Sequence, residues 1–274
     1  MADTEHISIV ELGVEDAQAG LALSTEAHWN QNESDWRFFL SKGIVFGVRD
    51  SEQLVATAAL LPYASDNAWI SMVLVTTNWR RRGIATRLVD ACLNAATKLG
   101  LSTWLDATPA GAAVYGPLGF TPTLQLRRLR LEQPAEGAAT QPLSACSLDA
   151  LIARDTSAIG FDRAPLLTEF GSRLGSRIVS DCHAMALVRN GRTARHIGPL
   201  LADSREHALV LVDAITRSEA GPWIVDAVHS NDAFLKGLTN SGWNIERPFQ
   251  RMRFGRATTQ AAELPFAVAG PEFG

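Results

Sequence analysis

The chain has 274 residues, of which 46% are hydrophobic and 20% are charged, and its formal net charge is -4. This composition is typical of a globular protein of about two domains, and the acidic balance excludes a broad basic surface for nucleic acid. No apolar run is long enough to span a membrane, and the charged first residues do not predict a signal peptide. The separated Cys92, Cys146 and Cys182 favour free thiols in a reducing cytoplasm and predict no metal site.

The first part of the chain has a mixed pattern of strands and helices. Residues 68–75 are apolar on both faces, which is typical of a buried central strand. Apolar residues then recur at helical spacing from Leu88 to Leu99, and Gly100 follows where a glycine ends many helices. Further strands are predicted, in chain order, at 6–12, 43–63 (two strands around a turn at 50–53), 102–107 and 124–131.

The second part of the chain repeats the first. LVDA occurs at 88–91 and at 211–214, an offset of 123. Three further matches follow in the same order: 119–120 with 242–243 and 128–131 with 251–254 at the offset of 123, and 105–107 with 225–227 at 120. Four ordered matches predict two copies of one unit.

The Pro- and Gly-rich residues 133–143 read as a linker between the copies. We therefore predict an N-terminal domain at 1–132 and a C-terminal domain at 144–256. The tail at 257–274 is apolar for a free end and is predicted to dock on the protein.

A cluster of arginines separates the predicted central strand from the helix that follows it. Arg80, Arg81 and Arg82 precede Gly83, where the helix would begin. A helix N-terminus offers unpaired backbone N–H groups, glycine allows an anion to approach closely, and arginines add charge-assisted hydrogen bonds. These features predict a phosphate or pyrophosphate site, whereas arginines alone would also fit a solvated helix start.

The segment Arg80-x-x-Gly83-x-Ala85 resembles the Q/R-x-x-G-x-G/A loop of the GNAT superfamily of N-acetyltransferases. YGPLGF at 115–120 resembles the later Y-x-x-x-G-F signature of the same family, in the expected order and spacing. The resemblance covers about 7–131, and the second half resembles the C-terminal unit of tandem GNAT proteins. It implies a mixed α/β (α+β) fold with two tandem GNAT-like domains, each a mostly antiparallel twisted sheet flanked by helices.

The resemblance implies that acetyl-CoA is the acyl donor and coenzyme A the product. In the family, the coenzyme lies where the central strand splays from its neighbour, here 68–75 and 102–107. Strand backbone groups would pair with the pantetheine arm, and an N–H near Val73 would stabilise the developing negative charge. The implied coenzyme-binding residues are Val73, Leu74, Val75, Arg80, Arg81, Arg82, Gly83, Ile84, Ala85 and Thr86.

Tyr115 matches the general acid of the family, which protonates the leaving sulfur after direct attack by an amine in a ternary complex. A tyrosine that only packs is the alternative interpretation. Many members also use a carboxylate on the central strand to deprotonate the amine, but 68–75 contains none. Asp106, near the end of the neighbouring strand, is the candidate for this base.

Residues 28–36 (HWNQNESDW) lie between the first two predicted helices, a region that shapes the acceptor pocket in the family. One interpretation is that this segment is only a surface loop anchored by two tryptophans. The functional interpretation predicts substrate-binding roles for His28, Trp29, Asn30, Gln31 and Asp35.

The second copy lacks the features of the coenzyme site when it is aligned at the offset of 123. Asp203 and Glu206 then fall in the arginine loop, Leu238 replaces the catalytic tyrosine, and the polar 192–198 replaces the apolar central strand. Carboxylates repel a pyrophosphate, so we predict one acetyl-CoA per chain, with the second unit walling the acceptor pocket or completing the sheet.

The primary functional prediction is an acetyl-CoA-dependent N-acetyltransferase that acts on a primary amine of a small molecule. The alternatives are a protein or peptide N-acetyltransferase, and a non-catalytic acyl-CoA-binding sensor or scaffold, which the missing strand carboxylate leaves open. We expect a cytoplasmic monomer or homodimer with a small-molecule amine acceptor, without nucleic-acid or membrane partners.

Overall fold

The computed structural model describes residues 8–64, 66–134, 143–181, 183–255 and 264–274. The elements of the first half are β1 (Ile9–Glu11), η1 (Val14–Asp16), α1 (Ala17–Glu26), α2 (Glu33–Lys42), β2 (Ile44–Asp50), β3 (Gln53–Tyr63), β4 (Asn67–Val75), η2 (Thr77–Trp79), α3 (Ile84–Lys98), β5 (Ser102–Ala107), α4 (Pro109–Tyr115) and β6 (Thr121–Leu131). Those of the second half are β7 (Ser144–Ala145), α5 (Leu148–Ile159), α6 (Ala164–Ser172), β8 (Arg177–Ser180), β9 (Ala184–Asn190), β10 (Arg195–Ala202), α7 (Arg205–Ser218), β11 (Trp223–Val228), α8 (Asp232–Asn240) and β12 (Asn244–Phe254).

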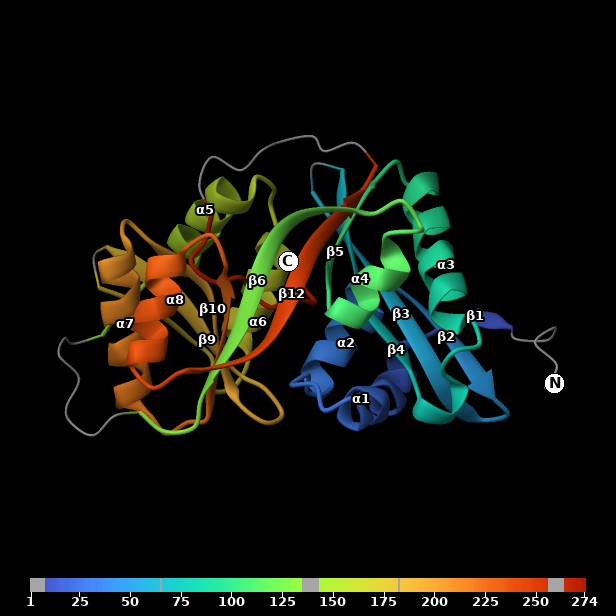
Figure 1. The fold of residues 1–274 in the computed structure, drawn as a ribbon, viewed down its shortest axis with the longest axis horizontal. Helices are drawn as coiled ribbons and strands as arrows, with labels where there is room; N and C mark the ends of the chain where they lie inside the picture. Colours follow the sequence, from blue (N-terminus) through green and yellow to red (C-terminus); the bar gives the residue numbers. More distant parts are fainter. Residues whose placement is uncertain (1–7, 65, 135–142, 182, 256–263) are drawn as a thin grey trace.

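The described strands form one continuous sheet of twelve strands in the order β1-β2-β3-β4-β5-β12-β6-β11-β10-β9-β8-β7. The two halves of the chain lie at opposite ends of this sheet, with α3 at one end and α7 and α8 at the other (Figure 1). The mixed α+β fold of two tandem units confirms the predicted fold class. Among the described residues, no helix combines the length and the apolar character that crossing a membrane requires.

The two halves exchange their last strands. β12 of the second half pairs antiparallel with β5, from Gln250↔Ala107 to Phe254↔Thr103. In return, β6 of the first half pairs antiparallel with β11, and β6 and β12 lie side by side at the centre of the molecule (Figure 1). The predicted division into 1–132 and 144–256 follows the chain, but the last strand of each segment completes the sheet of the other.

Two buried ion pairs connect the exchanged strands to their new neighbours. Arg128 on β6 donates from Nε and Nη2 to the two carboxylate oxygens of Asp226 on β11, both at 2.8 Å. Arg251 on β12 binds Asp106 on β5 in the same way, at 2.9 and 2.8 Å. Such bidentate pairs are strong and geometrically specific, and removal of one partner would leave an uncompensated buried charge.

Helices cover the sheet and form three separate apolar cores with it. α1 and α2 share one core with α5 and α6, where the rings of Phe38 and Phe170 lie 6.3 Å apart. α3 buries Leu88 and Cys92 in a second core against the strands of the first half, while α7 and α8 pack on the second half. The first core therefore joins the two halves.

Residues 264–274 run along the second half and end against the first. Ala267 forms β-bridges to both β10 and β11. The ring of Phe273 stacks on Phe39 of α2, with centroids 4.9 Å apart and an angle of 2° between the planes. Trp69 on β4 donates from Nε1 to the carbonyl oxygen of Pro271 at 2.9 Å. This C-terminal segment is buried from Ala267 to Gly274 and connects the two halves a third time.

The offset between the two copies is not constant, which corrects one part of the sequence alignment. β6 and β12 begin 123 residues apart, but β5 and β11 begin 121 apart. The prediction that the polar 192–198 replaces the central strand was therefore wrong. The equivalent strand is β10, in which 196–202 are all buried.

A buried histidine makes the stability of this fold depend on pH. His196 on β10 contacts Asp226 through Nε2 at 2.9 Å, and burial lowers its pKa to about 4, with Arg189 acting in the same direction and Asp226 opposing. In the unfolded chain the pKa is about 6.5, so the unfolded state binds a proton that the folded state excludes. The contribution of neutral His196 to the free energy of unfolding is therefore fully present above about pH 6.5, and it is lost as the pH decreases towards 4.

We expect the free energy of unfolding of the wild type to fall by about 2 kcal/mol more than that of His196→Asn between about pH 7.5 and pH 5.0. Chemical denaturation at both pH values measures the difference. His28→Asn, at an exposed position, serves as the control and should follow the wild type. Equal losses in wild type and His196→Asn would contradict the assignment.

Candidate active site

A pocket opens where two parallel strands separate. β4 and β5 pair only at Asn67↔Ser102, Ala68↔Thr103 and Trp69↔Trp104. Beyond these pairs, 70–73 of β4 and 105–108 at the end of β5 line a common pocket. Tyr115 at the end of α4 also lines it. The cleft that the sequence predicted between these two strands is therefore present, with the predicted general acid at its wall.

β4 is irregular where it lines the pocket. Met72 has a φ of +51°, and the register of β3 against β4 shifts between Thr57 and Ala59. Thr57 holds this bulge by donating from Oγ1 to the carbonyl oxygen of Met72 at 2.8 Å. Bulges of this kind re-aim side chains and backbone groups near functional sites. Val73, just past the bulge, lines the pocket and is half-buried.

The other two predicted strand residues lie elsewhere. Leu74 is buried in the core formed with α1 and α2. Val75 is half-buried, and its carbonyl oxygen accepts a hydrogen bond from Nε of Arg80 at 3.0 Å. Of the three predicted strand positions, Val73 is the one that lines the pocket.

The arginine loop forms the N-terminus of α3. Gly83, the residue before the helix, has a φ of +73°, and a Cβ there would meet nothing within 4 Å. Arg81 also has a positive φ, of +62°, and Arg80, Arg81 and Arg82 are exposed. The guanidinium group of Arg82 lies 4.7 Å from the ring centroid of Trp79. Open space, three positive charges and a helix N-terminus without a side-chain cap fit a pyrophosphate group.

The connection between β4 and α3 is fixed by a residue that sequence reasoning missed. Glu26, the last residue of α1, accepts hydrogen bonds from Thr76 Oγ1 at 2.6 Å and from Thr77 N at 2.8 Å. These hydrogen bonds lower the pKa of Glu26. The first turn of α3, at 84–86, follows this anchored connection, so its backbone N–H groups have a defined direction.

Tyr115 has the surroundings of a proton donor. Its side chain is buried, and its ring lies 6.1 Å from that of Phe120. Burial raises the pKa of the Tyr115 hydroxyl, so the group stays protonated at neutral pH. A protonated hydroxyl at the wall of the pocket can donate to a leaving group.

Asp106 does not offer a free carboxylate, which corrects the assumption behind its assignment as the base. Both of its oxygens accept hydrogen bonds from Arg251, and its side chain has no exposed surface. Burial raises the pKa of Asp106, and the Arg251 guanidinium opposes this shift. Although Asp106 lines the pocket, its role in the fold is to hold β12 against β5.

The structure divides the five predicted acceptor residues into two groups. Trp29 and Gln31 line the pocket, and Gln31 is 3% exposed. His28 is exposed and does not line it. Asn30 and Asp35 point to the second half of the chain instead.

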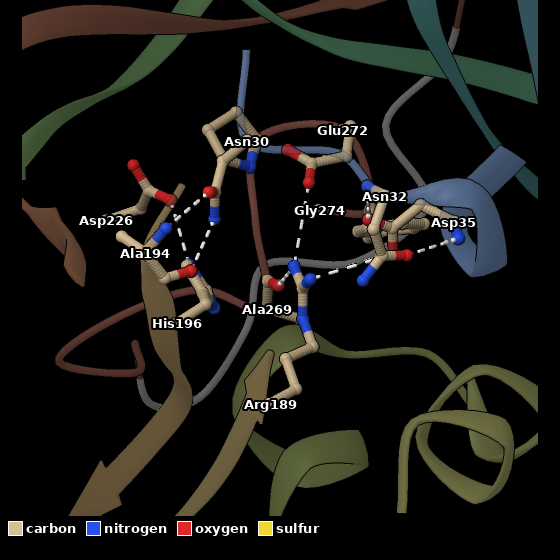
Figure 2. Close-up of polar contacts among 12 residues, drawn as sticks. Asn30, Asn32, Asp35, Arg189, Ala194, His196, Asp226, Ala269, Glu272 and Gly274 are labelled. Carbon is tan, nitrogen blue, oxygen red and sulfur yellow. Dashed lines mark hydrogen bonds and ion pairs between the residues drawn. The ribbon is translucent and has the colours of Figure 1, made fainter. Parts of the chain in front are cut away.

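Asn30 binds the hairpin between β9 and β10. Its Oδ1 accepts from the backbone N–H groups of Thr193 and Ala194 at 2.8 and 2.9 Å, and its Nδ2 donates to the carbonyl oxygen of Ala194 at 3.0 Å (Figure 2). Asp35 is buried and pairs with Nη1 of Arg173 at 2.6 Å. Both residues therefore hold the two halves together.

The second half contributes pocket residues that sequence reasoning missed. Arg247 and Phe249 come from the exchanged strand β12, and Pro271 and Glu272 come from the C-terminal segment. They join the pocket only because β12 and the C-terminal segment cross to the first half. The apolar character of the tail predicted docking but not its destination. Burial raises the pKa of Glu272, while Arg189 and Arg128 oppose the shift.

The corresponding cleft of the second half is filled by the chain itself. β10 and β11 pair only at Arg195↔Trp223 and His196↔Ile224 before they separate. The C-terminal segment lies between them: Leu200 N donates to the carbonyl oxygen of Ala267 at 2.9 Å, and Val268 N donates to that of Asp226 at 3.0 Å.

The loop that would bind a pyrophosphate is also missing in the second half. β10 reaches α7 through 203–204, whereas β4 reaches α3 through 76–83. Ser204 caps α7 by accepting from His207 N at 3.3 Å. Asp203 binds Arg154 at 2.7 Å, and Glu206 lies inside the first turn of α7 rather than in a loop.

Among the described residues, one group has the spacing to hold a metal ion. The potential ligand atoms of His183, Asp203 and His207 lie within 4.8 Å of one another on the surface of the second half. These side chains already have polar contacts, since His183 Nδ1 lies 3.2 Å from Asp203 Oδ2 and His207 Nδ1 lies 3.1 Å from Ser204 Oγ.

Two parallel strands that separate, followed by an arginine-rich helix N-terminus, match the class of acyl-CoA-dependent transferases that the sequence motifs predicted. The chain belongs to the GNAT superfamily and has two GNAT domains in tandem. The model of the acetyltransferase (GNAT) family matches 12–120, and that of an acetyltransferase (GNAT) domain matches 151–267. This membership supports acyl-CoA-dependent N-acetyltransferase activity.

Individual relatives agree over most of the chain. An uncharacterized N-acetyltransferase of Bacillus subtilis (strain 168), YitH, is 23% identical over 248 residues, which cover 86% of this chain and 87% of that protein. A putative acetyltransferase from Pyrococcus horikoshii has a TM-score of 0.83 at 18% identity and covers 98% of this chain and 96% of its own. A tandem GNAT protein from the clavulanic acid biosynthesis pathway has a TM-score of 0.64 at 15% identity, and the match covers 92% of this chain and 100% of that protein. These similarities show a shared fold.

We expect Asn30→Ala to lower the free energy of unfolding by about 1–3 kcal/mol, because it leaves buried backbone donors without a partner. Asn94→Ala, at an exposed position of α3, should change it by less than about 0.5 kcal/mol. Thermal and chemical denaturation of both variants measure the effect. Unchanged stability of Asn30→Ala together with a higher KM would instead restore Asn30 to the acceptor site.

Proposed function

We propose that the protein transfers the acetyl group of acetyl-CoA to a primary amine of a small molecule. One observation carries this proposal: the cleft between β4 and β5 and the side chain of Tyr115 share one pocket with buried side chains from both halves of the chain. Gln31, Phe249 and Glu272, which line this pocket, are each less than a tenth exposed. The family supports the acetyl transfer, and the burial of these lining residues supports a small acceptor.

The chain offers a separate group for each part of the reaction. The arginine loop and the first turn of α3 would bind the pyrophosphate of the donor, and the backbone of β4 near Val73 would align its pantetheine arm. Acetyl-CoA supplies an activated acetyl thioester. Tyr115 would donate a proton to the sulfur that leaves when the amine attacks directly in a ternary complex.

We expect Gly83→Glu to weaken the binding of acetyl-CoA by at least about 10- to 150-fold, because it places a carboxylate where the pyrophosphate would lie. Gly100→Glu is a matched control, since Gly100 lies at the opposite end of α3, also has a positive φ, of +70°, and also has open space around its Cβ position. Calorimetry with both variants separates repulsion at the site from backbone strain.

The wild-type titration should give one coenzyme per chain, because the second cleft contains the C-terminal segment. Equal affinity of Gly83→Glu and wild type would disprove the pyrophosphate site. Two coenzymes per chain would disprove the loss of the second site.

Tyr115→Phe should lower kcat about 100-fold and leave the affinity for acetyl-CoA unchanged. General acids contribute about 10²–10⁴-fold, and the low end applies because a thiol, with a pKa of about 8.5, leaves readily. Steady-state release of free thiol measures kcat, and calorimetry provides the control. Wild-type turnover in Tyr115→Phe would remove the proposed acid role.

A further inference from the structure

Two groups of opposite charge come from the second half and line the pocket that contains Tyr115. Glu272 belongs to the C-terminal segment, and Arg247 belongs to the exchanged strand β12. Neither group takes part in the transfer as described so far. Because both groups line the pocket that would receive the acceptor, they are candidates for binding it.

The position of Glu272 is fixed from both sides. The carbonyl oxygen of Pro271 accepts from Trp69 Nε1 at 2.9 Å, and that of Phe273 accepts from the Tyr63 hydroxyl at 2.9 Å. With its two neighbours anchored in the first half, the Glu272 carboxylate has a defined place in the pocket. A preorganised group of this kind loses little entropy when it binds a substrate.

Glu272 is paired less tightly than Asp106, the other acidic residue that lines the pocket. Its Oε1 lies 3.6 Å from Nη2 of Arg189, which is longer than a hydrogen bond (Figure 2). Arg189 also contacts Asp35 at 3.6 Å and donates to the carbonyl oxygen of Ala269 at 3.0 Å. Asp106, in contrast, is held by two short hydrogen bonds. Glu272 therefore keeps capacity to accept a proton or a hydrogen bond.

Arg247 carries a positive charge that the described residues do not neutralise by an ion pair. It is half-buried, and its guanidinium group lies 5.9 Å from the ring centroid of Phe249. Burial and the nearby Arg128 both lower the pKa of Arg247, which means that they destabilise its charged form. Arg128 itself is neutralised by Asp226. A guanidinium group in this environment favours an anionic ligand group, which it can bind through two parallel hydrogen bonds.

Two uncharged side chains of the pocket also lack partners. Ser71 is 8% exposed and Gln31 is 3% exposed, and neither Ser71 Oγ nor Gln31 Oε1 has a hydrogen-bond partner among the described residues. Buried polar atoms are nearly always paired, so these two atoms independently indicate a polar ligand.

We propose that the acceptor is a primary amine that also carries an anionic group, as an amino acid does, with Glu272 receiving a proton from the ammonium group and Arg247 binding the anionic group. Gln31 and Ser71 would hydrogen-bond the same molecule. This inference rests on the proposed acetyl transfer and narrows its acceptor. It also identifies Glu272, rather than Asp106, as the base.

The protons and electrons balance with these residues. Glu272 accepts one proton from the ammonium group, which frees the lone pair of the nitrogen. The C–N bond forms while the C–S bond of the thioester breaks, and Tyr115 gives its hydroxyl proton to the sulfur. The second proton of the nitrogen restores the Tyr115 hydroxyl, and Glu272 releases its proton to solvent. The products are the N-acetylated acceptor, coenzyme A and one proton.

The charged groups that face Glu272 determine how the reaction responds to pH. The charged groups are Arg189 on β9, Arg128 on β6, Arg247 on β12, Asp35 on α2 and Asp226 on β11, and the titratable hydroxyl of Tyr63 on β3 also faces Glu272. Burial raises the pKa of Glu272, and Arg189 and Arg128 oppose this shift. Because Glu272 acts when it is deprotonated, kcat/KM should rise as the pH increases through this pKa.

The test uses the full-length chain, acetyl-CoA and matched sets of acceptors, with release of free thiol as the signal. Each set contains an amino acid, the amine formed by its decarboxylation and an aminoalkyl phosphate, so that the carboxylate and phosphate are distinguished. We expect the anionic acceptors to exceed the decarboxylated amines in kcat/KM by about 10- to 150-fold.

The variants assign this preference to residues. Arg247→Gln should remove it mainly by raising KM for the anionic acceptors, with the decarboxylated amines little changed. Arg253→Gln, on the same strand but outside the pocket, is the matched control and should retain it. Glu272→Gln keeps the shape of the side chain. It should lower kcat/KM about 10²–10⁴-fold and abolish the rise of kcat/KM at the pKa of Glu272.

The outcomes separate this inference from the proposed function. Equal kcat/KM for anionic and decarboxylated acceptors overturns the acceptor class while acetyl transfer stands. Binding of acetyl-CoA without acetylation of any acceptor in the sets also overturns it. Failure to bind acetyl-CoA overturns the proposed function and the inference together. A Glu272→Gln variant with the wild-type pH profile overturns the role of Glu272 as base.

Discussion

The reciprocal exchange of β6 and β12 is the constraint on which the rest of the structure depends. At the centre of the sheet, Leu126 pairs with Phe249, which is its counterpart 123 residues later, so the two strands are related by a local twofold axis. Each half supplies the arginine that neutralises the buried aspartate of the other, Arg251 for Asp106 and Arg128 for Asp226. Neither half can complete its sheet or satisfy its buried acid alone, so their stabilities are coupled.

One of the two strand clefts forms a pocket and the other is filled by the chain, and the C-terminal segment contacts both. In the second half, the segment pairs with the backbone of β10 and β11 and occupies the space between them. It then continues to the first half, where Glu272 lines the open cleft. The same segment thus fills one cleft with Ala267 and Val268 and lines the pocket at the other with Pro271 and Glu272, so the second domain contributes to the wall of the candidate active site.

The sequence predicted local features well and the relation between the halves poorly, for a physical reason. The position of the arginine loop and that of Tyr115 each depend on residues within about one element of each other, and each segment of the repeat is itself short. The repeat even included the four ion-pair residues, since the matched segments contain Asp106, Asp226, Arg128 and Arg251. Which arginine lies beside Asp106 depends on which strands are neighbours in the sheet, and the sequence pattern does not give this order. The sequence alone therefore predicted neither the pairing of Asp106 with Arg251 nor the place of Glu272 in the pocket.

One strand position differs between the two clefts in a way that bears on the C-terminal segment. Aligning Asn67↔Ser102 in the first half with Arg195↔Trp223 in the second makes Gly198 on β10 the counterpart of Ile70 on β4. A Cβ at Gly198 would lie 2.1 Å from the carbonyl oxygen of Val268, so only glycine admits the C-terminal segment there. Ile70 carries a large buried side chain at the wall of the open pocket. The missing side chain at 198 therefore makes room for the segment in the second cleft, whereas the side chain of Ile70 occupies the corresponding place in the first.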